Sequence, residues 1–137
     1  MQEDLGEELY NMLAEVLNRP ENRAFFDSIR GEYGVMWYLL KKKTPVSAGE
    51  LTEKLHVVPG RMTDILKALE KKSYIIRQKD TFDRRVVNVQ LTKEGTEEAA
   101  ARRKEIHEEY CGLFTVLGEK DTKELIRLLK ILLTYSK

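Results

Sequence analysis

The sequence predicts a mainly α-helical fold with a small β component (class α+β), for three reasons. Apolar residues recur at helical spacing over most of the 137 positions. One pair of segments, residues 74–79 and 86–91, has the pattern of two β-strands. With 3 prolines, 8 glycines and 1 cysteine, the chain is neither a low-complexity segment nor a disulfide scaffold. We therefore expect one globular domain with appended helices.

The N-terminal third predicts three helical segments. In residues 4–17 the apolar side chains follow a helical repeat, and Asp4 with Glu7 has the spacing of a capping box. Residues 25–29 supply one or two further turns, and residues 32–42 form a stronger helix that is followed by a lysine-rich end. Cations at that end suit the helix dipole.

The next segment has the spacing of a helix-turn-helix. Ser47 and Glu50 form a capping box at the start of a short helix, residues 48–55. After a tight turn, Pro59 occupies the first position of a second helix, where its missing N–H is not needed. Residues 44–46, ahead of the first helix, are expected to be a short extended connector.

A β-hairpin is expected directly after the helix-turn-helix. Residues 86–91 alternate apolar and polar side chains, which is typical of a strand with one wet face. The polar turn that joins them to residues 74–79 carries Arg84 and Arg85. The tip of the hairpin is therefore expected to be cationic.

Two helices are predicted after the hairpin, residues 93–117 and 119–135, with Thr92 as N-cap and Gly118 as a left-handed residue between them. Apolar residues occupy seven of the nine positions from 125 to 133, too many for one contact face. The first helix likewise has no neighbour close in sequence. We therefore expect a homodimer with twofold symmetry; the alternative is a monomer whose terminal helices cover the core alone.

The formal net charge of +1 hides an uneven distribution. Residues 1–32 have a net charge of −5, residues 33–95 of +6 and residues 96–137 of zero. A basic centre between an acidic arm and a neutral tail favours binding of a polyanion by the central segment. The alternative is that the lysines and arginines only form helix faces that are exposed to solvent.

The most specific motif lies in residues 83–95. The stretch Asp83-Arg84-Arg85-Val86-Val87-Asn88-Val89-Gln90-Leu91-Thr92-Lys93-Glu94-Gly95 resembles the wing signature D-x-R-x-x-x-V-x-L-T-x-x-G of the MarR (multiple antibiotic resistance regulator) family. Residues 47–72 fit the helix-turn-helix register of that family. The resemblance implies a winged helix-turn-helix in residues 31–95, with helices for dimerisation in residues 1–30 and 96–137. It further implies a homodimeric transcriptional regulator, a repressor, that binds a pseudo-palindromic operator in double-stranded DNA.

Two residues depart from the family pattern. Val58 stands where a Ser or Thr usually caps the recognition helix, and loss of such a cap costs about 1 kcal/mol. Ser73 stands where a Gly usually ends that helix, so we expect a non-glycine residue in the left-handed region or a different exit angle.

In the implied recognition helix the apolar stripe lies opposite a polar face. The expected DNA-binding residues of the helix-turn-helix are Ser47, Gly60, Arg61, Thr63, Asp64, Lys67 and Lys71. Arg61 can donate two hydrogen bonds to guanine, and Thr63 can use its hydroxyl or its methyl. Asp64 can accept from cytosine, or it can pair with Lys67 or Lys71 of its own helix. The two lysines suit phosphates, and Gly60 allows the backbone to approach the DNA closely.

At the hairpin tip, Arg84 and Arg85 can enter a minor groove, where narrow A-tracts concentrate negative potential. The resemblance implies that Arg85 makes this approach while Asp83 holds the wing. The alternative is that the Asp83–Arg85 pair only stabilises the turn, since surface pairs contribute about 0–1 kcal/mol.

The resemblance also implies an effector site for a small aromatic ligand, with Tyr10, Phe26, Tyr33 and Trp37 as candidate lining residues. Core packing explains these aromatics equally well. Cys111 is interpreted as a packed core or interface residue, with a redox role left open, because Glu108 and Glu109 precede it and no Lys or Arg lies within one turn. His56 and His107 lack ligand spacing, so neither a metal nor a cofactor is expected.

The remaining expectations concern function class and location. An enzyme is disfavoured because no nucleophile–base set, Gly-rich phosphate loop or paired acids stand out. The rival hypothesis is a winged-helix module that binds protein and no DNA. With an acidic first segment and no long apolar run, the chain is expected to be cytoplasmic and not membrane-bound.

Overall fold

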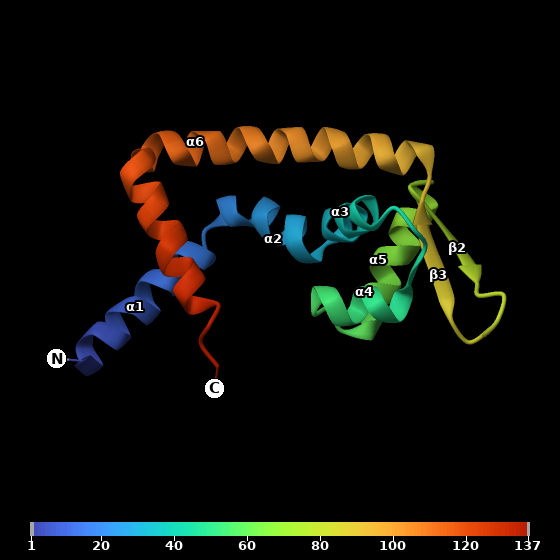
Figure 1. Cartoon of the computed structure of the whole chain (residues 1–137), viewed down its shortest axis with the longest axis horizontal. Helices are drawn as coiled ribbons and strands as arrows, with labels where there is room; N and C mark the ends of the chain where they lie inside the picture. Colours follow the sequence, from blue (N-terminus) through green and yellow to red (C-terminus); the bar gives the residue numbers. More distant parts are fainter. Residues whose placement is uncertain (1, 137) are drawn as a thin grey trace. The chain divides into compact units, whose positions relative to one another are not determined.

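A computed structural model describes residues 2–136 and divides the chain into two units that meet between Ala100 and Ala101 (Figure 1). The elements are α1 (Gln2–Leu17), the 3-10 helix η1 (Pro20–Asn22), α2 (Arg23–Arg30), α3 (Glu32–Lys42), β1 (Val46–Ser47), α4 (Ala48–Leu55), α5 (Pro59–Lys71), β2 (Ile75–Lys79), β3 (Val87–Leu91) and α6 (Lys93–Leu132). The predicted mainly α-helical class with a helix-turn-helix and a hairpin is confirmed.

The core of the first unit lies between α3, α4, α5 and the sheet. Among its most deeply buried apolar side chains are Val35, Met36, Leu39, Leu51, Met62, Leu66, Leu69, Ile75 and Val89, each 4% exposed or less. The apolar stripes predicted for residues 32–42 and for the recognition helix therefore face this core. Burial of each such side chain stabilises the fold by about 1.5–3 kcal/mol.

The sheet has three antiparallel strands in the order β1-β3-β2, one more than the hairpin predicted from the sequence. Val46, expected in an extended connector, pairs with Val89 of β3, and Ser47 pairs with Asn88. Two residues are too few to show a period-two pattern. Strand β1 therefore exists because of pairing with β3 and not because of a local preference.

Local conformational rules predicted the ends of several helices. Pro59 is the first residue of α5, and Ser73 has a φ of +67°, so the first of the two alternatives for Ser73, a left-handed non-glycine residue, is the one observed. Ser73 N–H donates to Glu70 O and Tyr74 N–H donates to Leu69 O, which completes a Schellman motif at the end of α5. Helix α6 is interrupted at Gly118, where φ is +82°.

Other boundaries differ from expectation. Helix α1 begins at Gln2, so Asp4 lies inside the helix and does not begin it as a capping residue. Ser47 Oγ accepts from Glu50 N–H at 3.1 Å as predicted, but the Glu50 carboxylate accepts from the Tyr38 hydroxyl. Helix α6 ends at Leu132, three residues before the predicted end.

Each unit leaves apolar side chains uncovered within the single chain. On α1, Leu5, Leu9, Met12, Leu13 and Val16 are between 47% and 66% exposed. On the C-terminal half of α6, Leu125, Ile126, Leu128, Leu129, Ile131 and Leu132 are between 42% and 55% exposed. Among residues 2–136, no helix combines the length and the apolar character that crossing a membrane requires.

Candidate nucleic-acid interface

Helix α5 presents a polar face opposite its buried stripe. Gly60, Arg61, Thr63, Asp64, Lys67 and Lys71 are all exposed, as the sequence predicted. Arg61, Lys67 and Lys71 form no hydrogen bond or ion pair with any residue that the structure describes, so their charges remain available. Asp64 is equally unpaired among those residues. The hypothesis of an intrahelical pair between Asp64 and a lysine is therefore wrong for the single chain.

The N-terminus of α5 is open. Val58 is the N-cap residue and provides no side-chain hydrogen bond, as expected, while its own side chain is 69% exposed. The Thr63 hydroxyl donates to Pro59 O at 3.0 Å, which orients the Thr63 methyl and leaves the oxygen able to accept. A Cβ added at Gly60 would meet nothing within 4 Å. The surface around Gly60 is therefore free for the approach of a ligand.

Two ion pairs hold the C-terminal end of α5 against its neighbours. Arg77 on β2 donates to the Glu70 carboxylate, with Nη2 2.8 Å from Oε1 and Nε 3.3 Å from Oε2. This contact lowers the pKa of Glu70 and raises the pKa of Arg77. Lys72 Nζ lies 2.7 Å from Glu32 Oε1 on α3, and that hydrogen bond raises the pKa of Lys72. None of these four residues was singled out from the sequence.

A third contact, also missed, connects α3 with α4. The Tyr38 hydroxyl donates to Glu50 Oε2 at 2.6 Å, and this hydrogen bond raises the pKa of Tyr38 to about 12. Because Ser47 caps the same helix, the start of α4 is held on both sides. Ser47 is only half-buried, so its hydroxyl remains near the surface.

The loop between β2 and β3 is organised around Asp80. Its Oδ2 accepts from Phe82 N–H at 3.0 Å and from Asp83 N–H at 2.9 Å, and its Oδ1 accepts from Asn88 Nδ2 at 2.9 Å. These bonds, with the Asp83 N–H contact first, lower the pKa of Asp80. The turn therefore has one defined shape, and the hairpin carries it away from α4 and α5 (Figure 1).

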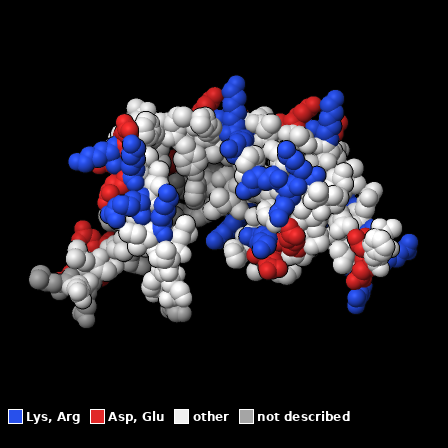
Figure 2. Space-filling view, viewed as in Figure 1, with Lys and Arg blue, Asp and Glu red and all other residues white. Residues whose placement is uncertain are grey.

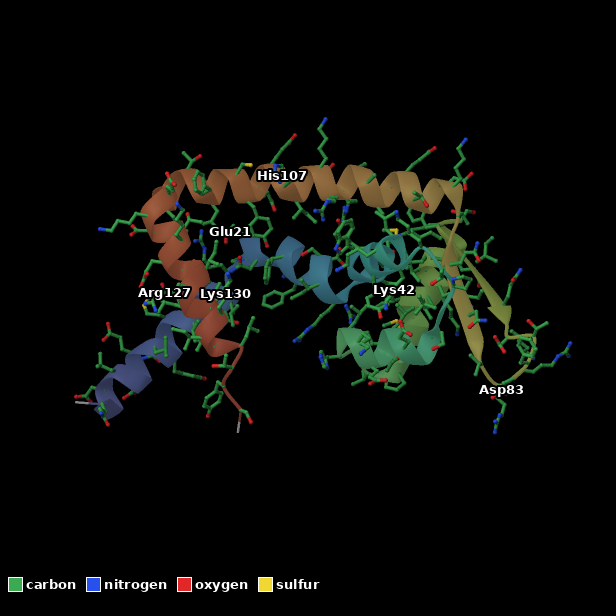
Figure 3. All side chains as sticks on the ribbon, in the orientation of Figure 1. Glu21, Lys42, Asp83, His107, Arg127 and Lys130 are labelled. Atoms are coloured by element: carbon green, nitrogen blue, oxygen red, sulfur yellow. The ribbon has the colours of Figure 1, made fainter. Side chains whose placement is uncertain are left out.

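Asp83 and Arg85 form the ion pair that the sequence predicted, at the hairpin end where Figure 3 labels Asp83. Arg85 Nε and Nη2 lie 3.0 and 3.1 Å from the two carboxylate oxygens, and Arg85 N–H donates to Oδ1 at 3.0 Å. The pair lowers the pKa of Asp83 and raises that of Arg85. Arg84 is exposed and unpaired among the described residues. Figure 2 shows basic and acidic groups side by side at this end.

The end of the motif fixes the wing to the start of α6. Thr92 Oγ1 accepts from Gly95 N–H at 2.9 Å, which confirms Thr92 as the cap, and it donates to Ser73 O at 2.6 Å. A Cβ at Gly95 would lie 2.0 Å from Tyr74 O. The local structure thus explains both residues of the motif: Thr92 caps α6, and Gly95 leaves room for the backbone at Tyr74, just before β2.

The four candidate effector residues differ in burial and in their contacts. Tyr10 is 70% exposed on α1, and the half-buried Phe26 on α2 packs edge-on against Phe25 with centroids 5.6 Å apart. Tyr33 is 4% exposed and stacks on Trp37 at 6.4 Å. Tyr33 therefore contributes to the core, as the packing alternative expected.

Cys111 is exposed in the single chain, so the core-packing interpretation is wrong there. Its Sγ lies 3.6 Å from His107 Nε2, one turn earlier on α6, where Figure 3 labels His107. No contact is predicted for His107 from the sequence; the spacing of four residues on one helix is the signal that could have found the contact with Cys111. The placement of Cys111 at an interface between two copies stays a prediction.

Residues 35–87 match the model of the MarR family. Over 79 residues the chain is 38% identical to the HTH-type transcriptional repressor MdtR of Bacillus subtilis (strain 168), and this stretch is 56% of the chain and 51% of MdtR. The match thus spans about half the length of that relative.

Solved structures share the fold. A mutant MarR from E. coli complexed with operator DNA superposes with a TM-score of 0.72 at 22% identity, over 90% of this chain and 92% of that one. The transcriptional regulator BldR from Sulfolobus solfataricus superposes with a TM-score of 0.74 at 19% identity, over 98% of each chain.

Proposed function

We propose that the chain is a sequence-specific transcriptional regulator of the MarR family, a repressor, that binds double-stranded DNA, because residues 35–87 match the model of that family. The observation that carries the proposal is the unpaired basic face of α5. Arg61, Lys67 and Lys71 are exposed and have no partner among the described residues, beside a wing that exposes Arg84. The similar E. coli MarR was solved with operator DNA, and MdtR is named a repressor.

Each residue has a role that its position supports. Arg61 and Thr63, near the N-terminus of α5, read base edges in the major groove, and the unpaired Asp64 accepts from cytosine. Lys67 and Lys71 lie further along and neutralise phosphates. The backbone at Gly60 and the Ser47 hydroxyl approach the sugar-phosphate strand. Arg85, aimed by Asp83, enters the adjoining minor groove.

The experiment is selection of duplexes from a random pool by the full chain, followed by fluorescence anisotropy. Arg61→Ala should lose about 1–3 kcal/mol on the selected duplex and bind random DNA as the parent does. Lys71→Ala should weaken binding to both duplexes alike. Equal binding of the parent and both variants to all duplexes would show that α5 is not the reading element.

We include a homodimer in this proposal. The apolar side chains on α1 and on the end of α6 are 42% to 66% exposed in the single chain, and contiguous exposed apolar surface marks sites of protein–protein contact. A second copy of each helix would cover them in a twofold arrangement. The division into dimerisation helices, residues 1–30 and 96–137, and a DNA-binding region, residues 31–95, follows from this assignment. Two recognition helices would then contact half-sites about 34 Å apart.

A small aromatic effector is the last part of the proposal. The half-exposed Trp37 ring lies under Lys41 Nζ at 5.7 Å, a combination that suits an aromatic carboxylate better than a neutral ligand. Trp37 is the one tryptophan of the chain, so its fluorescence reports directly on binding. Titration with a panel of aromatic carboxylates should change that emission and release the selected duplex. If no compound of the panel changes the Trp37 emission or releases the duplex, the chain does not bind an effector of this class.

A further inference from the structure

Phe82, at the tip of the β2–β3 hairpin, is the most exposed large apolar side chain among the described residues. Its exposed fraction is 98%, and its ring contacts no other described aromatic ring. The rows of exposed apolar residues on α1 and α6 are explained by a second copy of those helices, but Phe82 belongs to neither row. A phenylalanine left in water forgoes the burial that usually stabilises it, so a surface that covered the ring would gain that free energy.

The backbone that carries this ring is fixed. Phe82 N–H donates to Asp80 Oδ2 at 3.0 Å, and the next N–H donates to the same oxygen. Asn88 on β3 holds the other oxygen of Asp80 at 2.9 Å. The ring therefore projects from a defined turn at the end of a narrow two-stranded ribbon, and little ordering is needed when it is covered.

The charge around the ring selects the partner. Between Lys79 and Arg85 the hairpin carries three cationic and two acidic side chains. Both carboxylates are occupied by donors within the loop, and Asp83 faces Arg85, whereas Arg84 is unpaired among the described residues. An exposed apolar ring, two residues before the exposed Arg84 and three before the exposed Arg85, suits a polyanion with an apolar interior. Duplex DNA has both properties in its minor groove, where apolar wedges enter between base steps beside arginines.

We propose that Phe82 is a specificity-determining residue that acts as a minor-groove wedge. Its ring packs against the sugars and partly unstacks one base step, next to the position that Arg85 contacts. The inference rests on the proposed DNA-binding function. Pyrimidine–purine steps unstack most easily, so the wing reads deformability at a position where it makes no base-specific hydrogen bond. Duplexes with TA or CA steps under the wing would be preferred over stiff A-tracts.

The experiment uses the full chain, with the duplex that the parent selects from a random pool, and 2-aminopurine placed at successive flanking positions. Binding of the parent should raise 2-aminopurine fluorescence at one step in each half-site. Phe82→Ala should abolish that rise and weaken binding about tenfold, in line with the loss of an aromatic stacking contact. The slope of log affinity against log salt should stay unchanged because no charge is removed. Phe82→Leu, which keeps an apolar wedge, should retain most of the affinity.

Matched controls separate this inference from the function on which it rests. Thr81→Ala, an exposed change in the same loop, should leave affinity and fluorescence as in the parent. Arg84→Ala should make the slope of log affinity against log salt shallower by about one, without abolishing the fluorescence rise. If the parent binds no duplex at low salt, the proposed function fails. If the parent binds but Phe82→Ala retains its affinity and its fluorescence rise, the wedge alone is refuted.

Discussion

Arg77 on β2 holds Glu70 on α5 by two hydrogen bonds, of 2.8 and 3.3 Å, and so connects the wing to the recognition helix. The pair is seven residues apart in sequence, across the turn at which Ser73 adopts its left-handed conformation. Two elements that would contact neighbouring grooves of DNA are thus held in one relative orientation.

The first prediction concerns this pair. Glu70→Gln should lower the free energy of unfolding slightly at neutral pH and weaken binding to the selected duplex, because the wing loses a tether. Arg77 lowers the pKa of Glu70 from its usual 4.5, so the contribution is present above that pH and is lost as the pH falls through the lowered value. Urea unfolding at pH 7 and at pH 3 checks this. If the difference in the free energy of unfolding between the parent and Glu70→Gln were larger at pH 3 than at pH 7, the predicted pH dependence would be contradicted.

The second prediction concerns Asp83 and Arg85. If Asp83 aims Arg85 at DNA, the effects of Asp83→Asn and Arg85→Ala on affinity should be strongly non-additive in a double-mutant cycle. Asp83→Asn alone should weaken binding less than Arg85→Ala, because the guanidinium remains. Thermal unfolding serves as the control, since an exposed pair contributes little to stability. Additive losses would mean that the two residues act separately and that the pair stabilises only the turn.

Much of the fold could be predicted because it follows from local chemistry. Pro59 at the start of α5 and the break at Gly118 each depend on the conformational preferences of a few consecutive residues. The left-handed Ser73 is one of two alternatives that follow from the resemblance to the MarR family. The polar face of α5 follows from helical periodicity alone.

The remainder depends on contacts between distant segments. Strand β1 forms because β3 lies beside it, and no pattern within Val46–Ser47 predicts a strand. Tyr38 bonds to Glu50 across 12 residues, and Lys72 bonds to Glu32 across 40. The exposure of Phe82 likewise depends on how the loop turns. Sequence periodicity cannot identify such partners, because charged and aromatic residues have many alternatives until the tertiary structure is formed.

The third prediction uses two glycines with opposite surroundings. Gly95→Ala should destabilise the fold by about 1–3 kcal/mol, because the added Cβ would lie 2.0 Å from Tyr74 O. Gly60→Ala meets open space inside a helix and should stabilise the fold by about 0.5–1 kcal/mol. The same change should weaken DNA binding, because the methyl group prevents close approach of the backbone. Gly60→Ala with unchanged affinity would remove Gly60 from the interface.

The fourth prediction concerns assembly. The full chain should elute as a species of about twice 16.0 kDa in size-exclusion chromatography with light scattering. Leu129→Glu, on the apolar end of α6, should shift it to the mass of one chain, whereas Lys120→Glu on the same helix should not. DNA affinity should fall together with dimer mass. A parent of 16.0 kDa at micromolar concentration would contradict the dimer.

The salt dependence of duplex binding by the parent chain tests DNA contact through α5 and the wing most directly. If the basic faces of α5 and the wing of two copies contact phosphates, log affinity should fall against log salt with a slope of about −4 or steeper, at roughly −0.9 per phosphate. The slope should become shallower when Lys67 and Lys71 are both replaced by alanine. A flat slope, or the same slope in parent and variant, would contradict DNA binding through these side chains.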